Sequence, residues 1–356
     1  MAPGVPIHLR PGGRRLPLSL AAIASLLLAA AGVAGPAQAT FGGRDGLVAV
    51  SHFESSGGQY RISLFTMNPD GTDRQRLTTP DWGFADTSPH WSPDGTKIAF
   101  ERDDNTVGDA DIYVVNADGS GLTKITDCAG QKTGATPFDY CGGYFGPVWT
   151  PDGRSIVVTR CCIHLPDSDH QTIDIMNADG TGLRQVTFDP AAGGGDANAS
   201  VSPDGKWIAF SRAVGNKDGH VIGNALFLVH PDGSGLRQVT SYELFVDEKD
   251  WSPDGSRIVF VTHAHINGKT KPFRADIDTI RPDGTGLTQL TSTAPGQTFA
   301  FAPNWSPAGD RIIFDFFPGP DGQTNVYTMR PDGTDVRVVP GTSNDNPTDW
   351  GTAPTR

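Results

Sequence analysis

The sequence has little that could cross or attach to a membrane beyond its first 34 residues. Its one long apolar run extends from Leu16 to Ala34, and no second run of that length follows. Cysteine is scarce, with four in 356 residues, and none stands in the Cys-x-x-Cys pairs typical of zinc sites. Cations are outnumbered, with 28 Lys and Arg against 40 Asp and Glu. We therefore expect a soluble mature protein that binds neither nucleic acid nor anionic membranes.

The first 39 residues have the composition of an export signal. Arg10, Arg14 and Arg15 precede the apolar run without any acidic residue, and Ala37-Gln38-Ala39 follows it. We expect a signal peptide over residues 1–39, cleaved after Ala39, and a secreted or periplasmic protein that inserts into no membrane afterwards. An uncleaved anchor is the alternative, because the run is nearly long enough to span a bilayer. Loss of three arginines would change the net charge from −12 to −15.

Two turn signatures alternate along the rest of the chain. In Ser92-Pro93-Asp94-Gly95, proline presets φ for the first corner and glycine adopts the left-handed conformation of a tight turn. This signature recurs at residues 150–153, 202–205, 252–255 and 306–309, where Ala308 replaces the aspartate. The second signature occurs at residues 68–71, 116–119, 177–180, 230–233, 281–284 and 330–333. Such regular recurrence indicates a repeat architecture.

Each turn is flanked by short runs rich in β-branched and aromatic residues, which predicts four antiparallel strands per repeat. The first repeat lacks its first strand, and Asn346–Gly351 resembles the missing segment. We therefore expect an all-β, six-bladed β-propeller over residues 40–356, with four-stranded antiparallel blades and a C-terminal strand that pairs with Leu47–Val50 and completes blade one. Closure of this kind removes free sheet edges. An open solenoid is the alternative.

Tryptophan recurs at one position of the repeat, just before the first turn. Val201 takes this position once, and the other copies have Trp91, Trp149, Trp251, Trp305 and Trp350. A row of aromatic rings could form a carbohydrate platform. Equivalent aromatics at strand ends are better explained as core residues that pack between blades.

The alternation of Trp-Ser-Pro-Asp-Gly with Asn-Ala-Asp-Gly, followed by Leu-Thr, resembles the TolB-like β-propeller family over residues 44–351. The resemblance implies a periplasmic propeller that docks a lipoprotein within a cell-envelope complex. Only the propeller is expected here, without the α/β domain that precedes it in TolB. Prolyl-oligopeptidase-type peptidases carry a related propeller, but this sequence has no Gly-x-Ser-x-Gly nucleophile elbow. We therefore favour binding over catalysis.

The remaining connections are long and irregular, and they should lie together at the end of the propeller opposite the tight turns. Variable loops on a rigid scaffold are the usual place for function. The candidate binding residues on these connections are His164, Asp167, His170, His220, Glu248, Asp250, His263 and His265. Imidazoles and carboxylates in this arrangement could bind a divalent metal, or they could be solvated loop residues. No cofactor is predicted.

All four cysteines lie on or beside two of these connections: Cys128, Cys141, Cys161 and Cys162. With an export signal and an even count, we expect two disulfides. Cys128–Cys141 with a vicinal Cys161–Cys162 bridge is one pairing, and two bridges between the connections, in either order, are the others. A four-cysteine zinc site is the competing hypothesis.

The sequence thus predicts a monomeric binding scaffold, secreted or periplasmic, whose partner is another envelope or extracellular protein. The alternative is a metal-assisted lyase or hydrolase that acts on polysaccharide or a small ester at the long-loop face. The candidate residues form no complete catalytic motif.

Overall fold

The computed structural model describes residues 41–105, 109–128, 143–165, 168–188, 194–215, 221–263, 275–293, 299–318 and 322–353. Within these ranges the regular structure is β, apart from the 3-10 helix η2 (Tyr242–Leu244). The described helix content includes nothing long and apolar enough to cross a membrane. The prediction of an all-β chain is confirmed.

The strands of the described residues form four sheets. The first contains β1 (Asp45–Ser56), β2 (Gln59–Met67), β3 (Gln75–Arg76), β4 (Phe84–Trp91), β5 (Lys97–Asp104), β6 (Asp109–Asn116), β7 (Thr123–Lys124) and β24 (Asp345–Thr352). The second contains β8 (Tyr144–Trp149), β9 (Ser155–Leu165), β10 (Ser168–Asn177) and β11 (Arg184–Gln185). The third contains β12 (Gly195–Val201), β13 (Ile208–Gly215), β14 (Val221–Val229) and β15 (Arg237–Gln238). The fourth contains β16 (Val246–Trp251), β17 (Ile258–His263), β18 (Ala275–Ile280), β19 (Thr288–Gln289), β20 (Phe299–Trp305), β21 (Ile312–Phe317), β22 (Asn325–Met329) and β23 (Arg337–Val338).

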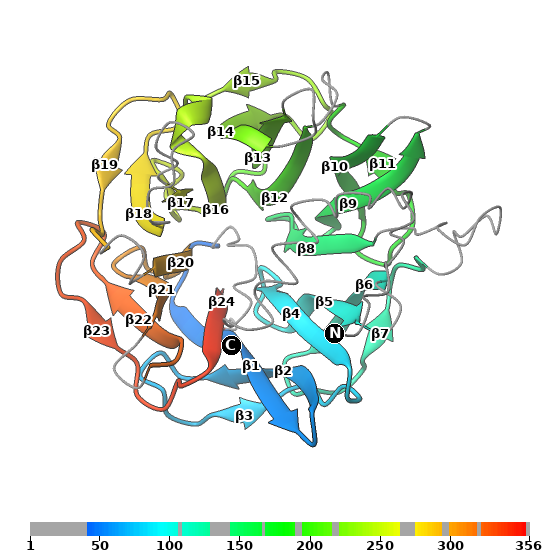
Figure 1. Ribbon diagram of the computed structural model, residues 1–356, viewed down its shortest axis with the longest axis vertical. Coiled ribbons are helices and arrows are strands. Elements are labelled where there is room, and N and C mark those ends of the chain that lie inside the picture. The colour runs from blue at the N-terminus through cyan, green and yellow to red at the C-terminus, as the bar shows by residue number, and fades with distance from the viewer. Residues whose placement is uncertain are drawn as a thin grey trace, which may run out of the picture.

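Each of the two larger sheets divides into two four-stranded groups. β2 and β4 are joined by one parallel residue pair, Ile62 with Ala85, and β18 and β20 by the pair Ala275 with Phe299. Figure 1 shows the groups arranged around a common centre. The strands β4, β8, β12, β16, β20 and β24 lie innermost, and each contacts the next, with β24 in contact with both β20 and β4 (Figure 1).

The second turn of each repeat packs against the preceding group. Gly180 has φ +85°, and a Cβ there would lie 1.9 Å from the carbonyl oxygen of Ile125, so only glycine fits. The same contact recurs as Gly71 with Pro340, Gly119 with Leu77, Gly233 with Val186, Gly284 with Val239 and Gly333 with Leu290. Gly71 of the first repeat thus contacts the last repeat, although it meets Pro340 rather than Val339, the residue equivalent to Leu77 and Ile125.

The five recurrent tryptophans are buried, each with 2–3% of its surface exposed. Trp149 belongs to a core cluster with Ala99 and Ile112 of the preceding group, so the apolar core lies between neighbouring groups. The prediction of core residues is therefore confirmed, and these rings offer no carbohydrate platform.

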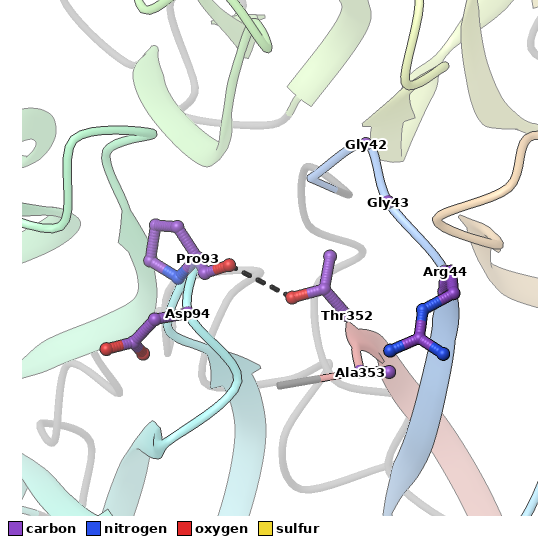
Figure 2. Close-up of a pocket in the computed structure, with 7 residues that line it drawn as sticks. All are labelled: Gly42, Gly43, Arg44, Pro93, Asp94, Thr352 and Ala353. Atoms are coloured by element: carbon purple, nitrogen blue, oxygen red, sulfur yellow. Dashed lines mark hydrogen bonds between the residues drawn. The ribbon is translucent and has the colours of Figure 1, made fainter. Parts of the chain in front are cut away.

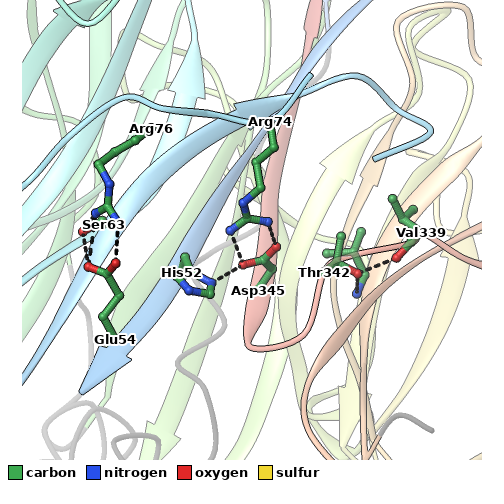
Figure 3. A network of polar contacts seen from close by, with 9 residues as sticks. His52, Glu54, Ser63, Arg74, Arg76, Val339, Thr342 and Asp345 are labelled. Carbon is green, nitrogen blue, oxygen red and sulfur yellow. Dashed lines mark hydrogen bonds and ion pairs between the residues drawn. The ribbon is translucent and has the colours of Figure 1, made fainter. Parts of the chain in front are cut away.

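The predicted pairing of the C-terminal strand is confirmed. β24 runs antiparallel to β1, with Trp350 opposite Val48 and Asp345 opposite His52. The buried Asp345 carboxylate lies 2.6 Å from Nδ1 of His52 and accepts a two-pronged contact from the Arg74 guanidinium (Figure 3). The last strand is therefore held to the first group by its backbone and by buried charge.

Candidate functional site

Glu248 and Asp250 lie on the innermost strand β16 rather than on a surface connection, so this part of the prediction is wrong. Both are buried, at 8% and 0% exposure. The Glu248 carboxylate accepts a hydrogen bond from the backbone N–H of Ala302 at 2.7 Å, and Asp250 accepts one from Trp305 at 2.8 Å. Both carboxylates therefore bind the neighbouring strand β20.

Between these two carboxylates stands Lys249, which is fully buried. Its Nζ donates to the carbonyl oxygen of Asn198 on β12 at 2.7 Å. The Asn198 amide in turn donates to the carboxylate of Asp247, which lies 3.4 Å from Nε2 of His263 at the end of β17. The Asp247 side chain is 36% exposed and that of His263 is 16% exposed, so this side of the cluster is open to solvent.

Burial sets the protonation of this cluster. Desolvation, reinforced by the carboxylates of Asp247 and Asp315, holds the pKa of Glu248 well above its usual range. Desolvation lowers the pKa of the Lys249 ammonium to about 7, against the attraction of Asp247 and Glu248. On β21, burial raises the pKa of Asp315 to about 7. We call Asn198, Asp247, Glu248, Lys249, His263 and Asp315 the axial cluster.

The axial cluster lies at the end of the propeller opposite the tight turns. β16 begins at Val246 and ends beside the turn at residues 252–255, so Asp247 is at the far end of the strand from that turn. This is the end predicted for function. Charged groups with perturbed pKa values near a solvent opening are typical of functional sites.

The other predicted residues are only partly described. The backbones of His164 and His170 belong to β9 and β10, with His164 opposite Asp169, where we expected a connection. Their side chains lie outside the described part of the structure, as do Asp167, His220 and His265 entirely. Among the described residues, no group of three or more His, Cys, Asp or Glu could hold a metal ion. The metal prediction stays open.

Cys128 and Cys161 are both buried. Cys141 lies outside the described residues, and the side chain of Cys162 is not described, so the two disulfides and their pairing stay predictions.

Sequence reasoning missed Lys249, Asn198 and Asp315. A signal for Lys249 was present in the sequence. It stands two residues before Trp251, and the same position in three other repeats is a proline: Pro89, Pro147 and Pro303. Asp315 stands between the apolar residues Ile312-Ile313-Phe314 and Phe316-Phe317, a pattern that indicates a carboxylate inside a core strand.

A small pocket of about 250 Å³ lies at the opposite, tight-turn end, lined by Gly42, Gly43, Arg44, Pro93, Asp94, Thr352 and Ala353 (Figure 2). Elsewhere a turn glycine packs on the proline of the preceding turn, as Gly153 does on Pro93. The first group has no such turn, because β24 and β1 come from opposite ends of the described chain. There the Thr352 hydroxyl donates to the Pro93 carbonyl at 2.9 Å instead. None of the predicted binding residues lines this pocket.

No family model matches the chain. The structure is similar to TolB from Acinetobacter baumannii, with a TM-score of 0.62 and 18% identity over 86% of this chain and 67% of that one. It is also similar to a putative TolB from Agrobacterium tumefaciens, with a TM-score of 0.60 and 18% identity over 87% and 95% of the two chains. These likenesses establish a TolB-like β-propeller fold.

Among curated proteins, the sequence is 29% identical over 175 residues to an uncharacterized peptidase, YuxL, of Bacillus subtilis, covering 49% of this chain and 21% of that protein. The chain spans about half the length, or less, of the first curated relatives that it matches.

Proposed function

We propose that residues 40–356 form a six-bladed propeller in which β24 completes the blade of β1, β2 and β3. The pairing of β24 with β1, the contacts between successive innermost strands and the seat of Gly71 against Pro340 support a closed ring. A closed ring provides a rigid frame whose two ends can carry different chemistry.

The propeller is proposed to be an exported, monomeric binding scaffold for another protein of the cell envelope. The observation that carries this proposal is the axial cluster, in which Asp247 and His263 are accessible while Lys249 and Glu248 behind them are buried. The buried groups fix the position of the exposed pair, and a fixed pair of ionisable groups suits recognition of a charged or polar group on a partner. The TolB-like fold and the predicted export signal agree with a place in the envelope.

The test is capture of partners from native envelope extracts on immobilised protein, quantified by mass spectrometry. The double variant Asp247→Asn, His263→Gln keeps the shape of the site and removes its charge. The control is Asp283→Asn, an exposed turn residue at the opposite end. We expect the enrichment of a specific partner to fall at least ten-fold in the double variant and to stay unchanged in the control. Loss in the control alone would place binding at the tight-turn end.

The alternative is a hydrolase or lyase at the same end. The match to an uncharacterized peptidase favours it, although that match spans only a fifth of the peptidase. Turnover of peptide, ester or polysaccharide substrates that is abolished in Asp247→Asn, with no partner captured, would select this alternative.

A further inference from the structure

Trp82 is the exception among the seven tryptophans of this chain. Five of them occupy the recurrent core position, and the ring of Trp207 packs against the ring of His230, with centroids 3.8 Å apart. Trp82 lies in the connection between β3 and β4, at the long-loop end, and is 37% exposed. A displayed indole combines a large apolar face with one N–H donor, and such residues are enriched at binding surfaces.

A second aromatic group lies beside the connection that carries Trp82. The N–H of Gly83 donates to the carbonyl oxygen of Tyr60 on β2 at 2.9 Å, so Trp82 lies close to the hairpin of β1 and β2. The rings of Tyr60 and Phe53 are stacked on this hairpin, with centroids 5.9 Å apart and planes 21° apart, and both residues are partly exposed. The hairpin reaches the outer edge of the molecule (Figure 1).

An ion pair supports the Trp82 ring. The Arg61 guanidinium lies 4.6 Å from the ring centroid and donates to the Glu54 carboxylate at 2.6 Å. The Glu54 carboxylate also accepts from the Ser63 hydroxyl at 3.1 Å, so the pair is fixed on the hairpin. The side chains of Arg61 and Glu54 are 20% and 19% exposed. The cation thus holds the orientation of the indole, while both charged groups keep contact with solvent.

A carboxyl group from β5 reaches the same place. The N–H of Asn105 donates to the carbonyl oxygen of Gly83 at 3.1 Å, which brings the end of β5 beside the Trp82 connection. The charge of Asp103 contributes, after burial, to the raised pKa of Tyr60. Aromatic faces and groups that donate or accept hydrogen bonds therefore meet between the first and second groups of strands.

We propose that this surface, formed by Glu54, Tyr60, Arg61, Trp82 and Asp103, binds a neutral glycan, with one pyranose ring stacked on Trp82. The C–H groups on a pyranose face pack against an aromatic ring, and its hydroxyls, which both donate and accept, suit a guanidinium and a carboxylate side by side. The net charge of −12 disfavours an acidic polysaccharide. The site is separate from the axial cluster and independent of the proposed protein partner.

The experiment is titration of the full chain with cellotriose, with triacetylchitotriose and with trigalacturonate, followed by tryptophan fluorescence and by calorimetry. A neutral trisaccharide should bind and change the emission, and the acidic one should bind at least about ten-fold more weakly. The change should come from Trp82, because the five core tryptophans are buried and Trp207 is stacked on His230.

Three variants place the binding. Trp82→Ala should weaken it at least about ten-fold and remove the fluorescence change, as expected when an aromatic anchor is truncated. Trp82→Phe keeps a ring and should lose less. The matched control is Phe188→Ala, which removes another exposed aromatic ring, 71% exposed, from a different connection at the same end. It should bind like the unmodified protein.

Unchanged affinity in Trp82→Ala would overturn the proposal, and so would an equal loss in Phe188→Ala. Absence of binding by all three sugars at about 10 mM would do the same. If Trp82→Ala lost a protein captured from envelope extracts while no sugar bound, the surface would be a protein contact and not a glycan site. Failed partner capture with intact sugar binding would remove the proposed function and leave this inference standing.

Discussion

Two sets of buried carboxylates, all on innermost strands except Asp315 of β21, differ in what faces them. Asp86 and Asp196 each receive a two-pronged arginine contact, from Arg102 and Arg212, at 2.6 and 2.7 Å. Asp345, at the equivalent position of β24, contacts Arg74 and the His52 that lies opposite it on β1. Asp315 and Glu248 are also buried, at 1% and 8% exposure, but in the contacts described above backbone N–H groups and Lys249 face them rather than an arginine.

The first set is explained by structure alone. Arg102 and Arg212 sit directly across from their aspartates on the adjacent strand, and their guanidinium carbons lie 4.8 Å from the ring of Tyr113 and 5.1 Å from that of Phe227. Each pair joins an inner strand to its neighbour and covers aromatic core. The second set has no such pair, because a backbone N–H, of Ala302 or of Phe301, donates to each carboxylate, and desolvation raises the pKa of both.

The largest expected effect comes from breaking a pair in the first set. Arg212→Leu would leave the Asp196 carboxylate buried without its cation, and we expect a loss of about 3–5 kcal/mol in the free energy of unfolding. Chemical denaturation followed by tryptophan fluorescence measures it.

Two further variants sharpen this result. Arg160 has the equivalent place opposite Tyr144, but it is 23% exposed and contacts Asp174 at 3.3 Å, so Arg160→Leu should cost less. The double variant Asp196→Leu, Arg212→Leu should recover most of the loss, because no charge is then left unpaired. A single variant within 1 kcal/mol of the unmodified protein would show that this pair contributes no more than a surface salt bridge.

A smaller effect is expected where a pair holds the last strand. Asp345→Asn keeps the shape of the side chain but removes the charge that Arg74 and His52 contact (Figure 3). Loss of charge-assisted hydrogen bonds should cost about 2–3 kcal/mol. Amide hydrogen exchange should rise first in Asp45–Ser56, the strand that pairs with β24. Unchanged protection of that strand would contradict a role for Asp345 in closure.

The sequence predicted this fold well because its signals are local. Turns such as Ser92–Gly95 are determined by the φ preferences of Pro93 and Gly95, and they recur often enough to define the strands between them. The pairing of Asn346–Trp350 with β1 followed from the same repeat.

The candidate site was harder to predict because its chemistry is non-local. Glu248 looks like a loop residue beside Asp247 and Lys249, and its burial depends on a register shift in β16 and on the N–H of Ala302, 54 residues later. The environment of Asp315 depends on its pairing with β20 and on the carboxylate of Glu248 on β16. No window of sequence contains these pairs.

The smallest expected effect concerns Asp315, in the second set. Here removal of the carboxylate should stabilise the protein, whereas the variants of the first set destabilise it. In the folded protein the pKa of Asp315 is raised to about 7 from 3.8, so between these values the folded state binds more protons than the unfolded state. This group should therefore lower stability as pH rises from about 4 to 7. Asp315→Asn cannot titrate, so its advantage over the unmodified protein should grow by about 1–2 kcal/mol between pH 5 and 6.5. Lys249, with its pKa lowered to about 7, acts above that window. The charge of Asp315 also raises the pKa of Glu248, so the difference between the two proteins includes the response of Glu248. Urea denaturation of the two proteins at half-unit pH steps measures the difference. A constant difference across the window would mean that Asp315 is ionised throughout and has a compensating partner of its own.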